Sequence, residues 1–113
     1  MFTNRKLPYE EITPKEAQKR LGTPPGLFVL DVREAEEFRA GHIDGAVLLP
    51  LGQLALHGAA LPKDRPILCV CHSGSRSSIA ASRLAAVGFT TINLRGGMFA
   101  WERERLPVTR GAS

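Results

Sequence analysis

Short continuous apolar runs alternate with amphipathic segments along the chain. The apolar runs are bounded by Gly, Pro or charged residues, which predicts strands that are buried on both faces. They cover residues 27–32, 46–49, 66–70 and 91–94. A further candidate strand lies near residues 9–12.

Helical segments are expected between these strands. A capping-box pattern over residues 13–16 begins a helix that ends at Gly22. In a later helix, Ala80, Leu84 and Val87 fall on one face, which predicts a buried stripe. Besides the first, the expected helices cover residues 35–40, 51–57, 76–87 and 98–103.

The alternation of strands and helices predicts the fold class. Strands separated by helices at this spacing indicate an α/β fold with a mainly parallel sheet and right-handed crossovers. In such sheets, ligands bind at the carboxyl ends of the strands. A chain of 113 residues is close to the common size of one domain, so we expect residues 1–113 to form a single domain.

Composition and charge narrow the range of partners. The chain is 43% hydrophobic and 23% charged, which is typical of a globular protein rather than a disordered one. The net charge of +4 comes from scattered basic residues, so no stripe for nucleic acid and no polybasic membrane anchor is expected. A mild positive bias suits anionic small molecules and acidic protein partners.

The sequence also bears on the compartment. The residues that follow Met1 contain no apolar run suited to a signal peptide. The uncharged stretch from Gly45 to Pro62 is interrupted by prolines, glycines and polar residues, which excludes it as a membrane span. We therefore expect a cytoplasmic protein without a membrane segment, whose thiols stay reduced.

The segment that begins at Cys71 is the strongest candidate for chemistry. Cys71 follows a buried strand, a loop of small residues comes next, and a helix begins at the end of that loop. Backbone N–H groups in such a loop can form an anion-binding nest, and the helix N-terminus adds a partial positive charge. Arg76 adds a fixed cation with planar donors. All three effects favour a thiolate, and such surroundings lower cysteine pKa values from ~8.5 to as little as ~3.5–7.5.

The loop after Cys71 is a candidate substrate- and anion-binding loop. Its residues are His72, Ser73, Gly74, Ser75, Arg76 and Ser77. The serine hydroxyls either donate to a bound anion or only cap the helix and satisfy the loop backbone. For Ser75 and Ser77, the two interpretations have equal weight.

Three motifs in register resemble the signatures of the rhodanese family of sulfurtransferases. They are Val29–Phe38 followed by Gly41–Ala46 and Pro50, the loop from Cys71 to Ser77, and Gly96–Trp101 followed by Leu106 and Pro107. The resemblance covers a core of about residues 9–107, which is nearly the whole chain.

This resemblance implies a five-stranded, mainly parallel sheet with helices on both faces. It also implies that Cys71 takes sulfane sulfur from a small donor such as thiosulfate or a persulfide, or from a protein, and becomes a persulfide itself. The sulfur then passes to an acceptor such as cyanide, a small thiol or a protein cysteine, in a ping-pong reaction. No metal or organic cofactor is expected.

Two alternatives stay open beside the enzyme. Some thiosulfate-handling rhodaneses carry a cation where this chain has Ser73, which favours a persulfide carrier or interaction module with little activity on thiosulfate. Phosphatase or arsenate reductase chemistry is disfavoured, because the phosphatase relatives have a longer loop. Here four residues separate Cys71 from Arg76.

Other polar and sulfur-containing residues are assigned mainly structural roles. Cys69 is expected to be a buried core residue, with a resolving thiol as the alternative. Asp31 and Arg33 are candidate supporting residues that either form an ion pair beside the site or anchor the turn after residue 41. His42 is expected to pack and hydrogen-bond within that turn, with a catalytic base as the alternative.

Overall fold

All five predicted strands form one parallel sheet. The computed structural model describes residues 7–112. The strands are β1 (Glu10–Ile12), β2 (Phe28–Asp31), β3 (Val47–Leu48), β4 (Ile67–Val70) and β5 (Thr91–Leu94). Their spatial order is β1-β5-β4-β2-β3, which puts β4 at the centre of the sheet. Every pairing is parallel, as the α/β pattern predicted.

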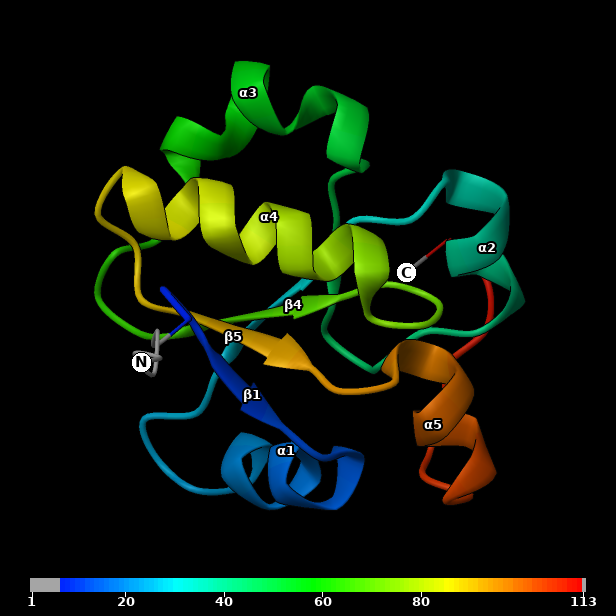
Figure 1. Cartoon of the computed structure of the whole chain (residues 1–113). Helices are drawn as coiled ribbons and strands as arrows, with labels where there is room; N and C mark the ends of the chain where they lie inside the picture. Colours follow the sequence, from blue (N-terminus) through cyan, green and yellow to red (C-terminus); the bar gives the residue numbers. More distant parts are fainter. Residues whose placement is uncertain (1–6, 113) are drawn as a thin grey trace, which may run out of the picture.

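Helices cover both faces of this sheet, as Figure 1 shows. The α-helices are α1 (Pro14–Leu21), α2 (Ala35–Ala40), α3 (Leu54–His57), α4 (Ser75–Ala86) and α5 (Gly97–Arg103). Short 3-10 turns over Leu51–Gln53 and Gly58–Ala60 flank α3. In Figure 1, α3 and α4 lie on one side of the sheet, and α1 and α5 lie on the other.

Two apolar clusters fill the spaces between the sheet and these helices. One cluster joins β1, β2, β4 and β5 to Ala17 of α1 and to Met98 and Trp101 of α5. The other joins β2 and β4 to Leu54 of α3 and to the small residues of α4. Because both faces of β4 are buried, its continuous apolar sequence is explained by its central place in the sheet.

Most predicted element boundaries are confirmed. The capping box of α1 is present: Thr13 Oγ1 accepts from the Glu16 backbone N–H, and Glu16 accepts from the Thr13 backbone N–H. The stripe predicted on α4 is wrong at Val87, whose side chain is 62% exposed. The α-helix ends at Ala86, so Val87 adopts a different backbone conformation and leaves the buried face.

No helix within residues 7–112 is long and apolar enough to cross a membrane. The segment from Met1 on which the signal-peptide prediction rests lies largely outside the described residues.

Candidate active site

Strand β4 delivers Cys71 to the carboxyl edge of the sheet. The four residues of β4 are buried, and Cys71 follows them directly with no exposed surface. The neighbouring strands β2 and β5 end at the same edge, because all pairings are parallel. Cys71 therefore lies where α/β sheets usually hold their ligands.

Two hydrogen-bond donors converge on the Cys71 sulfur. The Gly74 backbone nitrogen lies 3.1 Å from Sγ and the Ser77 hydroxyl oxygen lies 3.2 Å from it. Gly74 has a left-handed backbone with φ of 101°, which turns the loop sharply into α4. The donors thus come from the loop and from the first turn of α4, where backbone N–H groups lack intrahelical acceptors.

Helix α5 holds this loop from the other side. The backbone nitrogens of Met98 and Phe99 donate to the carbonyl oxygens of Cys71 and His72, at 2.8 and 2.9 Å. A Cβ atom at Gly97 would stand 2.4 Å from the Cys71 oxygen, so only glycine permits this approach. This contact explains why a glycine is required at Gly97, the second glycine of the motif Gly96–Trp101.

The surroundings lower the pKa of the Cys71 thiol. Burial of the sulfur acts to raise that pKa, but hydrogen bonds outweigh it. The donors are the Ser77 hydroxyl and the backbone N–H groups of Ser77, Gly74 and Ser73. The balance favours a thiolate, as the loop pattern predicted.

Cys69 has the opposite environment. It lies in the middle of β4, is fully buried, and belongs to the same apolar cluster as Cys71. Burial first, and the nearby Cys71 second, raise the pKa of Cys69 to about 12. A thiol that stays neutral in an apolar strand fits the predicted core role.

Arg76 is held by a partner that the sequence did not indicate. Its guanidinium donates to both carboxylate oxygens of Glu37, at 2.8 and 2.9 Å. The hydrogen bond from Arg76 lowers the pKa of Glu37 to about 2, so both charges persist at neutral pH. Glu37 therefore fixes the orientation of Arg76 and offsets much of its charge.

The buried pair of Asp31 and Arg33 shows both predicted geometries. The Arg33 guanidinium donates to the Asp31 carboxylate at 2.8 Å and to the Gly41 carbonyl oxygen at 2.8 Å. The following residue, His42, is buried with its ring stacked on Phe38 at 3.6 Å between centroids. Its Nδ1 lies 2.7 Å from the Phe38 oxygen, which fits the structural role expected for this histidine.

The structure separates the loop residues into two groups. Gly74 and Ser77 contact the Cys71 sulfur, whereas His72, Ser73 and Ser75 are exposed. The Ser75 carbonyl oxygen accepts from the Ser78 hydroxyl at 2.7 Å, which is a helix-terminus contact.

Sequence reasoning missed one buried polar residue at the site. Asn93 in β5 is 2% exposed, and its Oδ1 lies 2.6 Å from the Ser77 hydroxyl oxygen. The signal for it was available, because Thr91 and Asn93 are polar at alternate positions of an apolar strand. Buried polar side chains require partners, so such a pair indicates a contact.

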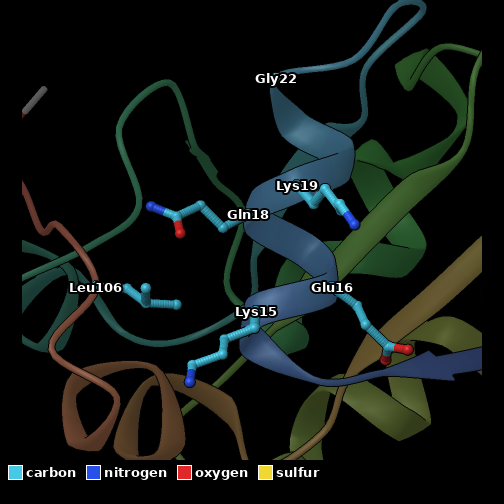
Figure 2. A pocket seen from close by; sticks show the side chains of 6 residues that line it. All are labelled: Lys15, Glu16, Gln18, Lys19, Gly22 and Leu106. Atoms are coloured by element: carbon cyan, nitrogen blue, oxygen red, sulfur yellow. The ribbon is translucent and has the colours of Figure 1, made fainter.

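The larger of two surface pockets lies away from this site, and the smaller one adjoins it. An open hollow of about 660 Å³ lies over α1, where Leu106 from the C-terminal segment faces Gln18 and Lys15 (Figure 2). None of its lining residues belongs to β4, the loop or α4. A cavity of about 260 Å³ adjoins the loop and is lined in part by His72, Glu37 and Arg33.

The chain is similar to known proteins along most of its length. It matches the family described as "Rhodanese-like domain" over residues 13–104. It is 36% identical over 98 residues to the putative sulfurtransferase YtwF of Bacillus subtilis, covering 87% of this chain and 95% of that protein. It is 34% identical to a protein named sulfurtransferase from Allochromatium vinosum, covering 87% of this chain and 92% of that one.

A third relative and one solved structure extend the comparison. The chain is 37% identical to the putative sulfur carrier protein YrkF of Bacillus subtilis, over 80% of this chain and 50% of that protein. The crystal structure of a rhodanese-related protein from Thermoplasma volcanium superposes with a TM-score of 0.84 at 28% identity. That match covers 89% of this chain and 98% of the other.

Proposed function

Since this chain belongs to the rhodanese-like domain family, we propose that it is a sulfurtransferase that carries sulfane sulfur on Cys71. The observation that carries the proposal is the convergence of Gly74 N–H and Ser77 Oγ on a buried sulfur at the carboxyl end of β4. A thiolate stabilised in this way is the nucleophile that sulfur transfer needs.

The first half-reaction loads the cysteine. The Cys71 thiolate attacks the sulfane sulfur of a donor, and a new S–S bond forms while the donor's own bond to that sulfur breaks. With thiosulfate, sulfite leaves with the electron pair of the broken bond and Cys71 becomes a persulfide anion. The loop from His72 to Ser77 offers backbone donors to that anion, as the Gly74 contact with Sγ illustrates.

The second half-reaction discharges the cysteine. A nucleophilic acceptor such as cyanide, a small thiol or a protein cysteine attacks the outer sulfur of the persulfide. The S–S bond breaks, and Cys71 leaves as a thiolate, ready for the next donor. The outer sulfur lies about 2 Å beyond Sγ, which brings it nearer to an acceptor than the fully buried Cys71 itself.

A second candidate function is persulfide delivery to a specific protein. Ser73 stands at the exposed rim of the loop in place of the cation that assists thiosulfate, and the thiol of Cys71 has no exposed surface. Both features favour a carrier with slow turnover on thiosulfate. The relative named as a putative sulfur carrier fits this interpretation.

We also propose that the protein works in the cytoplasm. Its two cysteines are free thiols, which suits that reducing compartment.

Steady-state thiocyanate formation from thiosulfate and cyanide tests the enzyme directly. We expect turnover in the wild type and in Cys69→Ser, and none above the uncatalysed rate in Cys71→Ser. Thiocyanate release that survives in Cys71→Ser would refute the assignment of Cys71. Turnover that is slow with cyanide but fast with a protein thiol would favour the carrier over the small-molecule enzyme.

A further inference from the structure

Asn93 is a buried amide whose polar atoms all have partners. Its Nδ2 donates to Glu11 Oε2 at 3.0 Å and to the Gly74 carbonyl oxygen at 3.2 Å. Its Oδ1 lies 2.6 Å from the Ser77 hydroxyl oxygen. Asn93 therefore contacts Gly74 and Ser77, whose backbone nitrogen and hydroxyl oxygen lie 3.1 and 3.2 Å from the Cys71 sulfur.

The partners of Asn93 fix the orientation of its amide. A carbonyl oxygen and a carboxylate oxygen only accept hydrogen bonds, so Nδ2 must face Gly74 and Glu11. Oδ1 must then face Ser77, and it can only accept. This arrangement favours a hydrogen bond in which the Ser77 hydroxyl donates its proton to Asn93 Oδ1.

Ser77 cannot satisfy both of its neighbours at once. Its hydroxyl has one proton, yet it lies 2.6 Å from Asn93 Oδ1 and 3.2 Å from Cys71 Sγ. With a neutral thiol, Cys71 donates to Ser77 and Ser77 donates to Asn93. Once the thiol proton has passed to solvent, Ser77 turns its own proton to the sulfur and leaves Oδ1 without a donor.

We propose that Asn93 is a positioning residue that competes with the Cys71 sulfur for the Ser77 proton and so holds the thiol closer to neutrality. The consequence for sulfur transfer rests on the proposed function of Cys71. A cysteine that ionises less readily is a stronger nucleophile per thiolate and a poorer leaving group. Asn93 would thus balance the loading of sulfur against its discharge.

The charged and titratable groups around this network do not mask the effect. Cys69 on β4 has a pKa raised to about 12 by burial, and Glu37 on α2 has a pKa lowered to about 2 by its bond from Arg76 on α4. Cys69 therefore stays neutral, and Glu37 and Arg76 stay charged, while Cys71 titrates. Glu11 on β1 loses the Asn93 donor in Asn93→Leu but keeps its ion pair with Arg95, and His72 in the loop is the same in every variant used below.

A purely structural role for Asn93 predicts the opposite sign. If its amide only braced the loop through the Gly74 carbonyl oxygen, its loss would loosen the donors to the sulfur. The thiolate would then be less stable, and Cys71 would titrate at higher pH. Competition for the Ser77 proton predicts titration at lower pH, because the hydroxyl is free to donate to the sulfur.

The test is a pH titration of the thiolate ultraviolet absorbance in the full chain, with Cys71→Ser as the blank. Asn93→Leu should move the midpoint to lower pH, and the thiolate-to-thiol ratio at fixed pH should rise about tenfold. Ser77→Ala should move the midpoint to higher pH, and Asn93→Leu should have no effect in the Ser77→Ala background. Thr91→Val is the matched control, since it removes a hydrogen bond from the same strand to the Ala81 carbonyl oxygen only.

A midpoint that rises or stays fixed in Asn93→Leu would overturn the proposal. Asn93→Val, which suits a strand, replaces it if the leucine variant does not fold, with the same expected direction. Sulfur uptake is measured on the same samples by intact mass. Uptake without the midpoint shift would refute the role of Asn93 alone, whereas the shift without uptake would refute the proposed function alone.

Discussion

Cys69 lies in the interior of β4 and Cys71 lies one residue beyond the end of that strand, and the surroundings of the two thiols differ. Both side chains are fully buried in the same apolar cluster. Around Cys69, burial raises the pKa to about 12, because no donor compensates for the loss of water. Around Cys71, hydrogen bonds from Ser77 and Gly74 outweigh burial, and the pKa falls below its usual value.

The comparison shows that burial alone does not decide the reactivity of a cysteine. In the strand interior, backbone N–H groups are committed to neighbouring strands and none is free for the sulfur. Beyond the strand end, the chain turns through Gly74 into α4 and aims N–H groups back at the sulfur. The difference therefore depends on the loop and on the elements that hold it.

Gly97→Ala should lower the unfolding free energy most. It pushes α5 away from the loop that α5 holds, and it leaves β4 unchanged. The new Cβ would stand 2.4 Å from the Cys71 carbonyl oxygen at a φ of 58°. We expect a loss of about 3 kcal/mol in unfolding free energy. Urea denaturation measures that loss, and most sulfur transfer should disappear with it.

Gly45→Ala is the control for this prediction. Gly45 also has a positive φ, 83°, but an added Cβ meets nothing within 4 Å. It should cost about 1 kcal/mol and leave sulfur transfer intact. An equal loss of unfolding free energy in the two variants would show that the close contact of Gly97 with the loop does not contribute to stability.

Cys69→Ala changes the strand interior and should leave the reactive thiol alone. Removal of one buried sulfur opens a small cavity in the cluster beside α4, which should lower the unfolding free energy by about 1.5 kcal/mol. The pH midpoint of Cys71 ionisation and the rate of sulfur transfer should stay at wild-type values. A loss of transfer in this variant would instead support the resolving-thiol role of Cys69.

Glu37→Gln weakens the hold on Arg76 at the edge of the loop. The folded pKa of Glu37 is lowered from 4.5 to about 2 by the bond from Arg76. The stabilisation is therefore complete above about pH 4.5 and is lost as the pH falls towards 2. Because the two side chains are 36% and 34% exposed, solvent screens the pair, and we expect only about 1 kcal/mol at pH 7.

Urea denaturation at neutral and acidic pH measures this contribution. The gap in unfolding free energy between wild type and Glu37→Gln should close as the pH approaches 2. Glu36→Gln, an exposed change on the same helix, should show no gap at either pH. A gap that stays constant with pH would argue against the ion pair.

Thr13→Ala should have the smallest effect and none at either cysteine. It removes the hydroxyl that accepts from Glu16 in the capping box of α1, on the far side of the sheet from α4. We expect a loss of about 0.5 kcal/mol by thermal or urea denaturation. An altered rate of sulfur transfer would show that α1 communicates with the site.

Local patterns predicted the elements well, because each apolar run and each cap acts within a few residues. The strand over 91–94 and the capping box of α1 are as predicted. Val87 was placed wrongly because periodicity cannot reveal where a helix stops. The side chains around the site could not be predicted in this way, because they are held by contacts between residues far apart in the sequence. Glu37 meets Arg76 across 39 residues, and Asn93 meets Glu11 across 82.

The most direct test of the account is the mass of the intact protein after incubation with thiosulfate or a small persulfide donor. Wild type and Cys69→Ala should each gain the mass of one sulfur atom, and cyanide or a thiol should remove it. Peptide mapping should place that sulfur on Cys71, and Cys71→Ser should gain nothing. A sulfur found on Cys69, or a wild type that takes up none from either donor, would contradict the account.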